Sequence, residues 1–149
     1  MDVSLKYKFG PCGLLCEKCF AYENGPIQTH ALQLKQQLGN FDNYAKRFVH
    51  LLHEPTFDKY TDFKEFLDLL ASGNCKGCRK QECHLFEACK VKDCYKDKKV
   101  DFCFQCNDFP CDKPGFDENL QQRWIKLNME IREIGLEKYY ERIKNKPRY

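Results

Sequence analysis

The sequence predicts a mainly α-helical protein, a small helical bundle with cysteine-rich metal-binding knuckles and little β structure. Apolar residues recur at helical spacing on both sides of a cysteine-rich stretch. That stretch contains the spacing C-x2-C-x4-C twice, and the chain shows no alternation of strands with helices. With 149 residues, of which 42% are hydrophobic, the chain can bury a core, and we expect a single domain over residues 1–149.

Residues 1–25 are expected to form an N-terminal knuckle. Cys12, Cys16 and Cys19 are spaced C-x3-C-x2-C, and Gly13 permits a turn that helps the sulfurs to converge. Radical S-adenosylmethionine enzymes use the same spacing to hold three irons of a cluster. Those enzymes need most of a barrel of alternating strands and helices, which this sequence does not predict. We therefore do not expect radical chemistry.

Residues 26–72 are expected to form helices. The apolar positions at helical spacing are Ile27, Ala31, Leu34 and Leu38, then Phe41, Tyr44, Ala45, Phe48 and Leu52, then Phe63, Phe66, Leu67 and Leu70. Gly39-Asn40 ends the first helix, the second ends before Pro55, and residues 71–74 close the third. We expect Phe63, Phe66, Leu67 and Leu70 to point inward.

Residues 73–114 are the cysteine-rich metal-binding segment. The repeated spacing is formed by Cys75, Cys78 and Cys83 and again by Cys103, Cys106 and Cys111. A C-x2-C pair brings two sulfurs about 3.5 to 4 Å apart, which suits the roughly 2.3 Å Zn–S bonds of a tetrahedral site. The segment has few apolar residues, so metal binding would have to stabilise it. Residues 98–102 are expected to form a short strand or an extended leg.

Residues 115–147 return to helix. Asp117 is a candidate N-cap, and Gly135 ends a run that Leu120, Trp124, Leu127, Ile131 and Ile134 line on one face. A last helix is expected to stop by Pro147.

Eleven cysteines allow more than one grouping of ligands. The three triplets account for nine of them, and Cys89 and Cys94 lie between the second and third triplets. His84 could supply a nitrogen as a twelfth ligand and complete three four-coordinate sites. Two sites of four cysteines with three spare thiols fit equally well. We expect two or three zinc ions as cofactor; an iron–sulfur cluster or thiol redox chemistry is the alternative, because C-x2-C also serves those sites.

Charge and targeting signals restrict the function classes. The formal charge of +3 would fall to roughly −2 if all eleven thiolates and three zinc ions were present, so nucleic-acid binding is possible but not favoured. No signal peptide or membrane span is evident, and we expect a cytoplasmic protein whose partner is another protein. The sequence contains no phosphate loop, zinc-protease motif or nucleophile–base pair, so we predict no catalytic residue and do not expect an enzyme.

Four segments carry a family resemblance: C-G-L-L-C-E-K-C, N-C-K-G-C-R, F-C-F-Q-C-N-D-F-P-C and W-I-K-L-N-M-E-I-R-E-I-G-L-E. They resemble the cysteine-rich prokaryotic family catalogued as domain of unknown function 3795. The resemblance implies metal binding without an established activity. The family-type cysteines it implies are Cys12, Cys16, Cys19, Cys75, Cys78, Cys83, Cys89, Cys103, Cys106 and Cys111. Cys94 is not part of that pattern.

Overall fold

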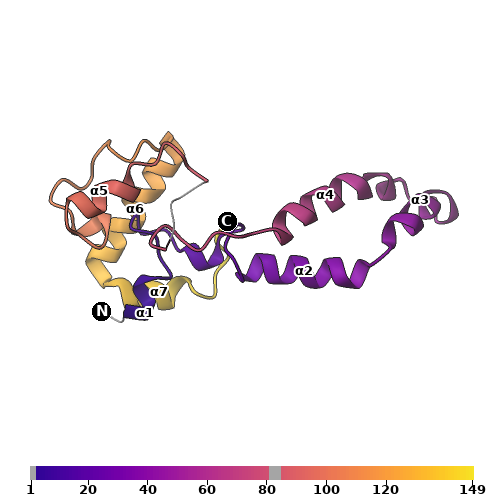
Figure 1. Ribbon diagram of the computed structural model, residues 1–149, viewed down its shortest axis with the longest axis horizontal. Coiled ribbons are helices and arrows are strands. Elements are labelled where there is room, and N and C mark those ends of the chain that lie inside the picture. Colours follow the sequence, from indigo (N-terminus) through magenta and orange to yellow (C-terminus); the bar gives the residue numbers. More distant parts are fainter. Residues whose placement is uncertain (1–2, 81–84) are drawn as a thin grey trace. The chain divides into compact units, whose positions relative to one another are not determined.

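The computed structural model describes residues 3–80 and 85–149, and it confirms the predicted mainly α-helical class (Figure 1). In chain order the elements are α1 (Val3–Lys6), the 3-10 helix η1 (Cys16–Lys18), α2 (Pro26–Leu38), α3 (Phe41–Leu51), η2 (Pro55–Lys59), α4 (Tyr60–Ala71), α5 (Val91–Asp97), η3 (Cys103–Gln105), α6 (Glu118–Ile134) and α7 (Leu136–Ile143). No strand forms within the described ranges, although an isolated antiparallel bridge joins Phe9 and Leu15.

The chain divides into two compact units. Met1–Cys19 and Cys75–Tyr149 together form what we call the cysteine unit, and Phe20–Asn74 forms the helical unit. All ten cysteines that the structure describes belong to the cysteine unit. The helical unit is therefore an insertion in sequence between the first cysteine triplet and the rest.

The helices of the helical unit begin and end close to where the sequence predicted. Pro26 occupies the first turn of α2, where a missing N–H costs nothing. Gly39 ends α2 with a φ of 49°, a conformation that glycine adopts without strain. The third predicted helix begins as η2 and continues as α4.

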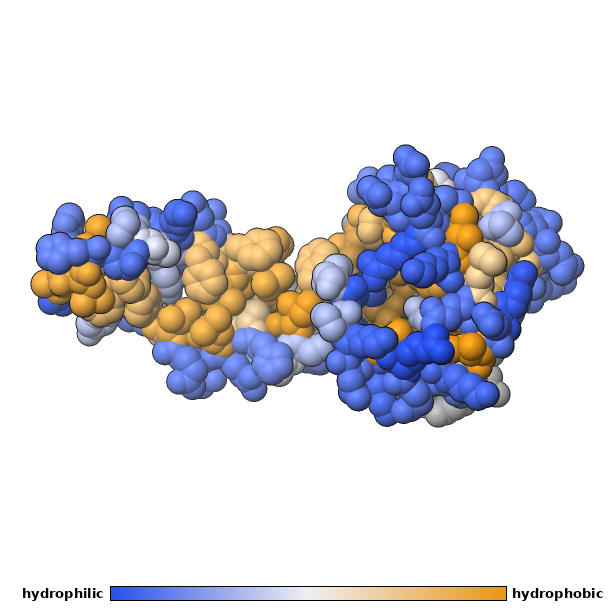
Figure 2. All heavy atoms as spheres, turned by 180° about the vertical axis from the view of Figure 1, so that it is seen from behind, coloured by the Kyte–Doolittle hydropathy of each residue, from blue (hydrophilic) through white to orange (hydrophobic). Residues whose placement is uncertain are grey.

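Helices α2 and α4 pack side by side through a narrow seam (Figure 1). The buried residues of this seam are Ala31, Leu67 and Ala71. Because two of the three are alanines, the helices can approach closely but bury little apolar area. The prediction that Phe63 and Phe66 point inward is wrong: they are 43% and 59% exposed. Figure 2 shows the resulting apolar surface along the helical unit.

The core of the cysteine unit is larger and is built around α6. Trp124, Phe9, Phe102 and Ile131 are its largest fully buried hydrophobic side chains. The Asp117 side chain caps α6 as predicted, accepting hydrogen bonds from two backbone N–H groups at 3.0 and 3.1 Å. The core therefore joins the N-terminal segment, the cysteine-rich segment and α6.

The cysteine-rich segment differs from its prediction in two details. Helix α5 was not predicted, and buried Val91 anchors it. Lys98 to Phe102 does not form a strand: a turn and a bend follow α5, and the backbone of Phe102 is extended, with φ −142° and ψ 152°. Within the described residues, no helix is both long and apolar enough to cross a membrane.

Candidate metal centre

Two of the C-x2-C pairs have the same backbone form. Cys16 and Cys103 each begin a 3-10 turn. The N–H groups of Cys19 and Cys106 donate back to the carbonyl oxygens of Cys16 and Cys103, at 2.8 and 3.0 Å. Both turns leave in an extended conformation, with φ/ψ of −70°/143° at Cys19 and −72°/137° at Cys106. A turn this tight lets the two sulfurs of a pair approach a common point, as a metal knuckle requires.

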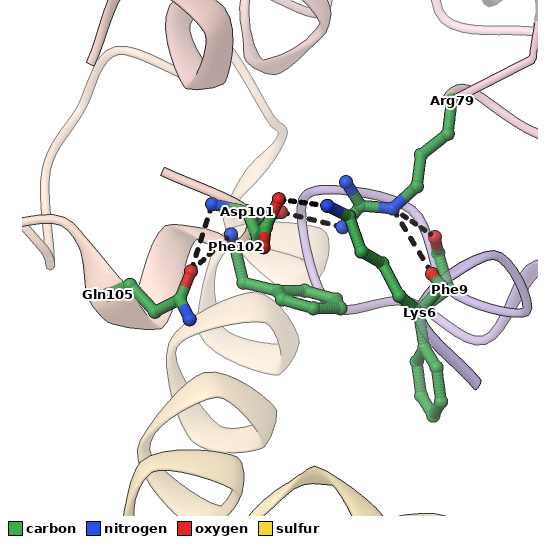
Figure 3. Close-up of polar contacts among 6 residues, drawn as sticks. All are labelled: Lys6, Phe9, Arg79, Asp101, Phe102 and Gln105. Atoms are coloured by element: carbon green, nitrogen blue, oxygen red, sulfur yellow. Dashed lines mark hydrogen bonds and ion pairs between the residues drawn. The ribbon is translucent and has the colours of Figure 1, made fainter. Parts of the chain in front are cut away.

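Side-chain contacts fix the turn at Cys103. The Gln105 Oε1 accepts hydrogen bonds from the backbone N–H groups of Asp101 and Phe102, at 2.9 and 3.0 Å (Figure 3). These bonds satisfy donors that a short 3-10 turn leaves unpaired. The polar side chain inside this C-x2-C pair therefore has a structural role.

Arg79 joins the segment after Cys78 to both neighbouring parts of the cysteine unit (Figure 3). Its Nε donates to the carbonyl oxygens of Lys6 and Phe9 at 3.1 and 3.0 Å, and an Nη donates to the carbonyl oxygen of Asp101 at 2.6 Å. Its guanidinium lies 4.5 Å from the centre of the Phe102 ring. Burial lowers the pKa of Arg79. The planar guanidinium carries five N–H donors, which suit hydrogen bonds to three carbonyl oxygens at once.

Four cysteines line one small cavity beside α5 and α6. They are Cys94, Cys103, Cys106 and Cys111. The cavity has a volume of about 30 Å³, and Val91, Phe109 and Trp124 are among its apolar walls. This volume suits an atom or ion of about the size of a water molecule.

Burial favours the neutral thiol at two of these cysteines, Cys103 and Cys94. Burial raises the pKa of Cys103 to about 12; the Trp124 indole opposes the shift, whereas the sulfurs of Cys111, Cys94 and Cys106 add to it. Burial also raises the pKa of Cys94, and the positive charge of Lys113 opposes it. Because neighbouring cysteines raise the pKa of both Cys103 and Cys94, these sulfurs lie close enough to interact electrostatically.

The indole N–H of Trp124 is a buried donor without an ordinary acceptor. Trp124 is 1% exposed, and its Nε1 has no hydrogen-bond partner among the described residues. The indole lowers the pKa of Cys103, so it favours the thiolate form of that side chain. A thiolate at Cys103 would be a stronger acceptor for this N–H than a neutral thiol.

A second set of sulfurs lies around Cys12. Burial raises the pKa of Cys12 to about 12, and Cys78, Cys103 and Cys89 add to the shift. A Cβ on Gly10 would lie 3.2 Å from the Cys12 sulfur and 3.5 Å from the Cys16 sulfur. Glycine at position 10 therefore leaves room for two sulfurs to converge.

Four further predicted ligands are Cys19, Cys75, Cys83 and His84. Cys75 is buried, and the Cys19 sulfur lies 3.7 Å from the Tyr149 hydroxyl. Cys83 and His84 lie outside the described residues. Within residues 3–80 and 85–149, no group of three or more cysteine, histidine, aspartate or glutamate side chains is arranged to hold a metal ion.

The structure thus groups the sulfurs differently from the sequence triplets. Cys94 shares a cavity with the third triplet, whereas Cys12 of the first triplet lies near Cys78 of the second. Sequence reasoning did not assign Arg79 or the Trp124 N–H to the cysteine segment. The only available signal was that Arg79 follows a C-x2-C pair directly.

A family model covers residues 8–115, which include every cysteine and the cavity walls up to Pro114. Its description is protein of unknown function (DUF3795). The chain belongs to the DUF3795 family. The DUF3795 match ends before α6, so the helix that carries Trp124 lies beyond the matched residues. No curated protein and no solved structure matches the chain.

Proposed function

We propose that this protein binds zinc through cysteine thiolates and that the best-supported site consists of Cys94, Cys103, Cys106 and Cys111. The observation that carries the proposal is that these four sulfurs line one cavity of ion size. Four thiolates are a donor set that zinc prefers in structural sites. Binding requires the four side chains to close around the ion, which rotation about their χ1 angles permits.

The surroundings of the cavity support a thiolate centre. A tetrathiolate zinc site carries a net charge of −2, and Lys90, Lys98 and Lys113 are among the lining residues. The unpartnered Trp124 N–H would gain an acceptor when Cys103 becomes a thiolate. Zinc binding would also counter the burial that raises the pKa of Cys103 and Cys94.

We assign the site a structural role in a cytosolic, protein-binding domain. A closed site with four protein ligands has no open position for water or substrate. The eleven cysteines, an odd number, favour metal binding in a reducing compartment over disulfide bonds. The exposed apolar residues of the helical unit, which include Leu51, Phe66 and Leu69, favour a protein partner.

An iron–sulfur cluster is the second candidate, because four cysteines also form the usual ligand set of such clusters. Elemental analysis of protein purified without oxygen, with an absorption spectrum of the same sample, separates the two. We expect zinc and no visible band. Iron with acid-labile sulfide and a broad visible band would show that the protein binds an iron–sulfur cluster instead of zinc.

Substitution tests which cysteines share the ion. We expect Cys94→Ser and Cys106→Ser each to lose one equivalent of zinc, and the double variant to lose the same single equivalent. Cys19→Ser is the control, since Cys19 does not line the cavity. Unchanged zinc in either single variant, or a loss of two equivalents in the double variant, would refute this ligand set.

A further inference from the structure

A groove in the cysteine unit, away from the cysteine-lined cavity, is rich in basic residues. It lies among the segment after Cys12, helices α6 and α7, and the C-terminal segment, with a volume of about 230 Å³. Its basic lining residues are Lys18, Arg123, Lys126, Lys146 and Arg148. Its single acidic lining residue, Glu130, forms an ion pair with Arg142, which is not part of the lining. The groove therefore carries a strong excess of positive charge.

Hydrogen bonds to main-chain carbonyls position several of these cations. Arg123 donates to the carbonyl oxygen of Arg148 at 2.8 Å, and an Nη of Arg148 donates to the carbonyl oxygen of Leu15. Lys18 donates to the carbonyl oxygens of Ile143 and Lys146. Because carbonyl groups are neutral, they orient the cations without cancelling their charge. A fixed cation loses less side-chain entropy when it binds a ligand.

One donor at this groove lacks an acceptor. The Nε of Arg148 is buried and has no hydrogen-bond partner among the described residues. A buried donor of a charged group is costly to leave unpaired. Lys126 likewise takes part in no ion pair within the described part of the chain. The buried Arg148 Nε favours an anionic ligand, and the Lys126 ammonium adds positive charge at the same groove.

The rest of the lining is apolar. Leu14, Leu15, Leu127 and Ile143 contribute to it, and buried Tyr139 adds an aromatic surface. The combination favours a ligand with an anionic head and a small organic body. The volume is below the roughly 300–1,000 Å³ that is typical of drug-sized ligands.

We propose that this groove binds a small organic phosphate, with the phosphate on the basic residues and the organic part on the apolar wall. A phosphate dianion matches the excess of cations better than a single carboxylate, and guanidinium groups bind phosphate oxygens in pairs. The site does not depend on the zinc proposal, since none of the groove residues is a cysteine.

Isothermal titration calorimetry at low ionic strength tests the proposal, with glucose 6-phosphate as the probe. Glucose and inorganic phosphate test the two halves of the ligand separately. We expect glucose 6-phosphate to bind at least about tenfold more tightly than either, and its affinity to fall as salt rises. Absence of binding to glucose 6-phosphate, or equal affinity for inorganic phosphate, would overturn the assignment.

Charge-removing variants locate the site. Lys126→Gln should weaken binding about fivefold to tenfold, and Arg148→Gln by at least as much. Lys138→Gln on α7 removes an equal charge outside the groove and should leave the affinity unchanged. Lys126 is exposed, so its variant should fold normally even if Arg148→Gln does not. Equal affinity of Lys126→Gln and Lys138→Gln for glucose 6-phosphate would refute the placement of the ligand in this groove. Zinc content should be unchanged in both variants, so this test is independent of the zinc proposal.

Discussion

The Nδ2 of Asn128 donates a hydrogen bond to the main-chain carbonyl oxygen of Cys12 at 2.8 Å, across 116 positions of sequence. The same nitrogen donates to the carbonyl oxygen of Trp124, also at 2.8 Å. Asn128 is fully buried and is the one polar or charged side chain among the buried residues that the structure describes. It ties the first cysteine of the chain to helix α6.

Asn128→Ala should lower the free energy of unfolding by about 2–4 kcal/mol. It removes both hydrogen bonds and leaves the Cys12 carbonyl oxygen buried without this donor. Urea denaturation at fixed zinc concentration measures the loss. Met129→Ala, at an exposed neighbour, should change stability by less than about 0.5 kcal/mol. Equal effects of the two variants would contradict a specific role for the amide.

Gly13→Ala should destabilise the protein by about 1–3 kcal/mol. The φ of Gly13 is +83°, and an added Cβ would lie 2.7 Å from the Leu127 Cδ1. A double-mutant cycle with Leu127→Ala separates the two causes, because truncating Leu127 removes the clash but not the backbone strain. We expect the Gly13 substitution to cost less in that background. If the stability losses of the two single variants simply add in the double variant, the contact between the new Cβ and Leu127 does not contribute to the destabilisation.

Trp124→Phe tests the indole N–H apart from the packing of the ring. Trp124 packs against Phe109 with ring centroids 4.8 Å apart, an edge-to-face contact that a phenylalanine can largely keep. Because the indole favours the thiolate form of Cys103, loss of its N–H should weaken zinc binding about tenfold or more. Competition with a chromophoric chelator measures the affinity. Trp124→Ala should in addition lower the free energy of unfolding by about 3–5 kcal/mol. If Trp124→Phe leaves the zinc affinity unchanged, the indole N–H has no role at the site.

Neighbouring positions on α4 should respond very differently to truncation. Leu67→Ala should cost about 2–4 kcal/mol, because Leu67 is the one large side chain among the three buried residues of this seam. Phe66→Ala should cost less than about 1 kcal/mol, since that ring is 59% exposed. Thermal unfolding monitored by circular dichroism compares the two. A larger loss from Phe66→Ala would mean that an apolar partner covers this face in solution.

The sequence predicted the position of most helices but not the faces that they bury. Apolar spacing and the stops at Gly39 and Gly135 located α2 and α6 correctly. Periodicity could not show that alanines form the α2–α4 seam, because the exposed Phe66 fits the same period as the buried Leu67. Burial depends on which neighbouring helix is present, and local spacing carries no information on that.

Cysteine spacing predicted knuckle turns but not which sulfurs meet. The turns at Cys16 and Cys103 follow from two residues between cysteines, which is a local property. Cys94 reaches the cavity because α5, a helix with few apolar residues, packs through Val91. The approach of Cys12 to Cys78 depends on how distant segments pack, which spacing alone does not determine.

The insertion of the helical unit affects the order in which the protein can assemble during synthesis. Phe9 packs against Tyr139, with ring centroids 6.3 Å apart, so the core that surrounds the first cysteines needs residues made about 130 positions later. At translation rates of roughly 5–20 residues per second, that interval is on the order of 6–26 seconds. The 55 residues from Phe20 to Asn74 leave the ribosome within it and can form helices first. The thiols of Cys12, Cys16 and Cys19 therefore stay uncovered during that interval, and the fold can enclose them only after the C-terminal helices have been made.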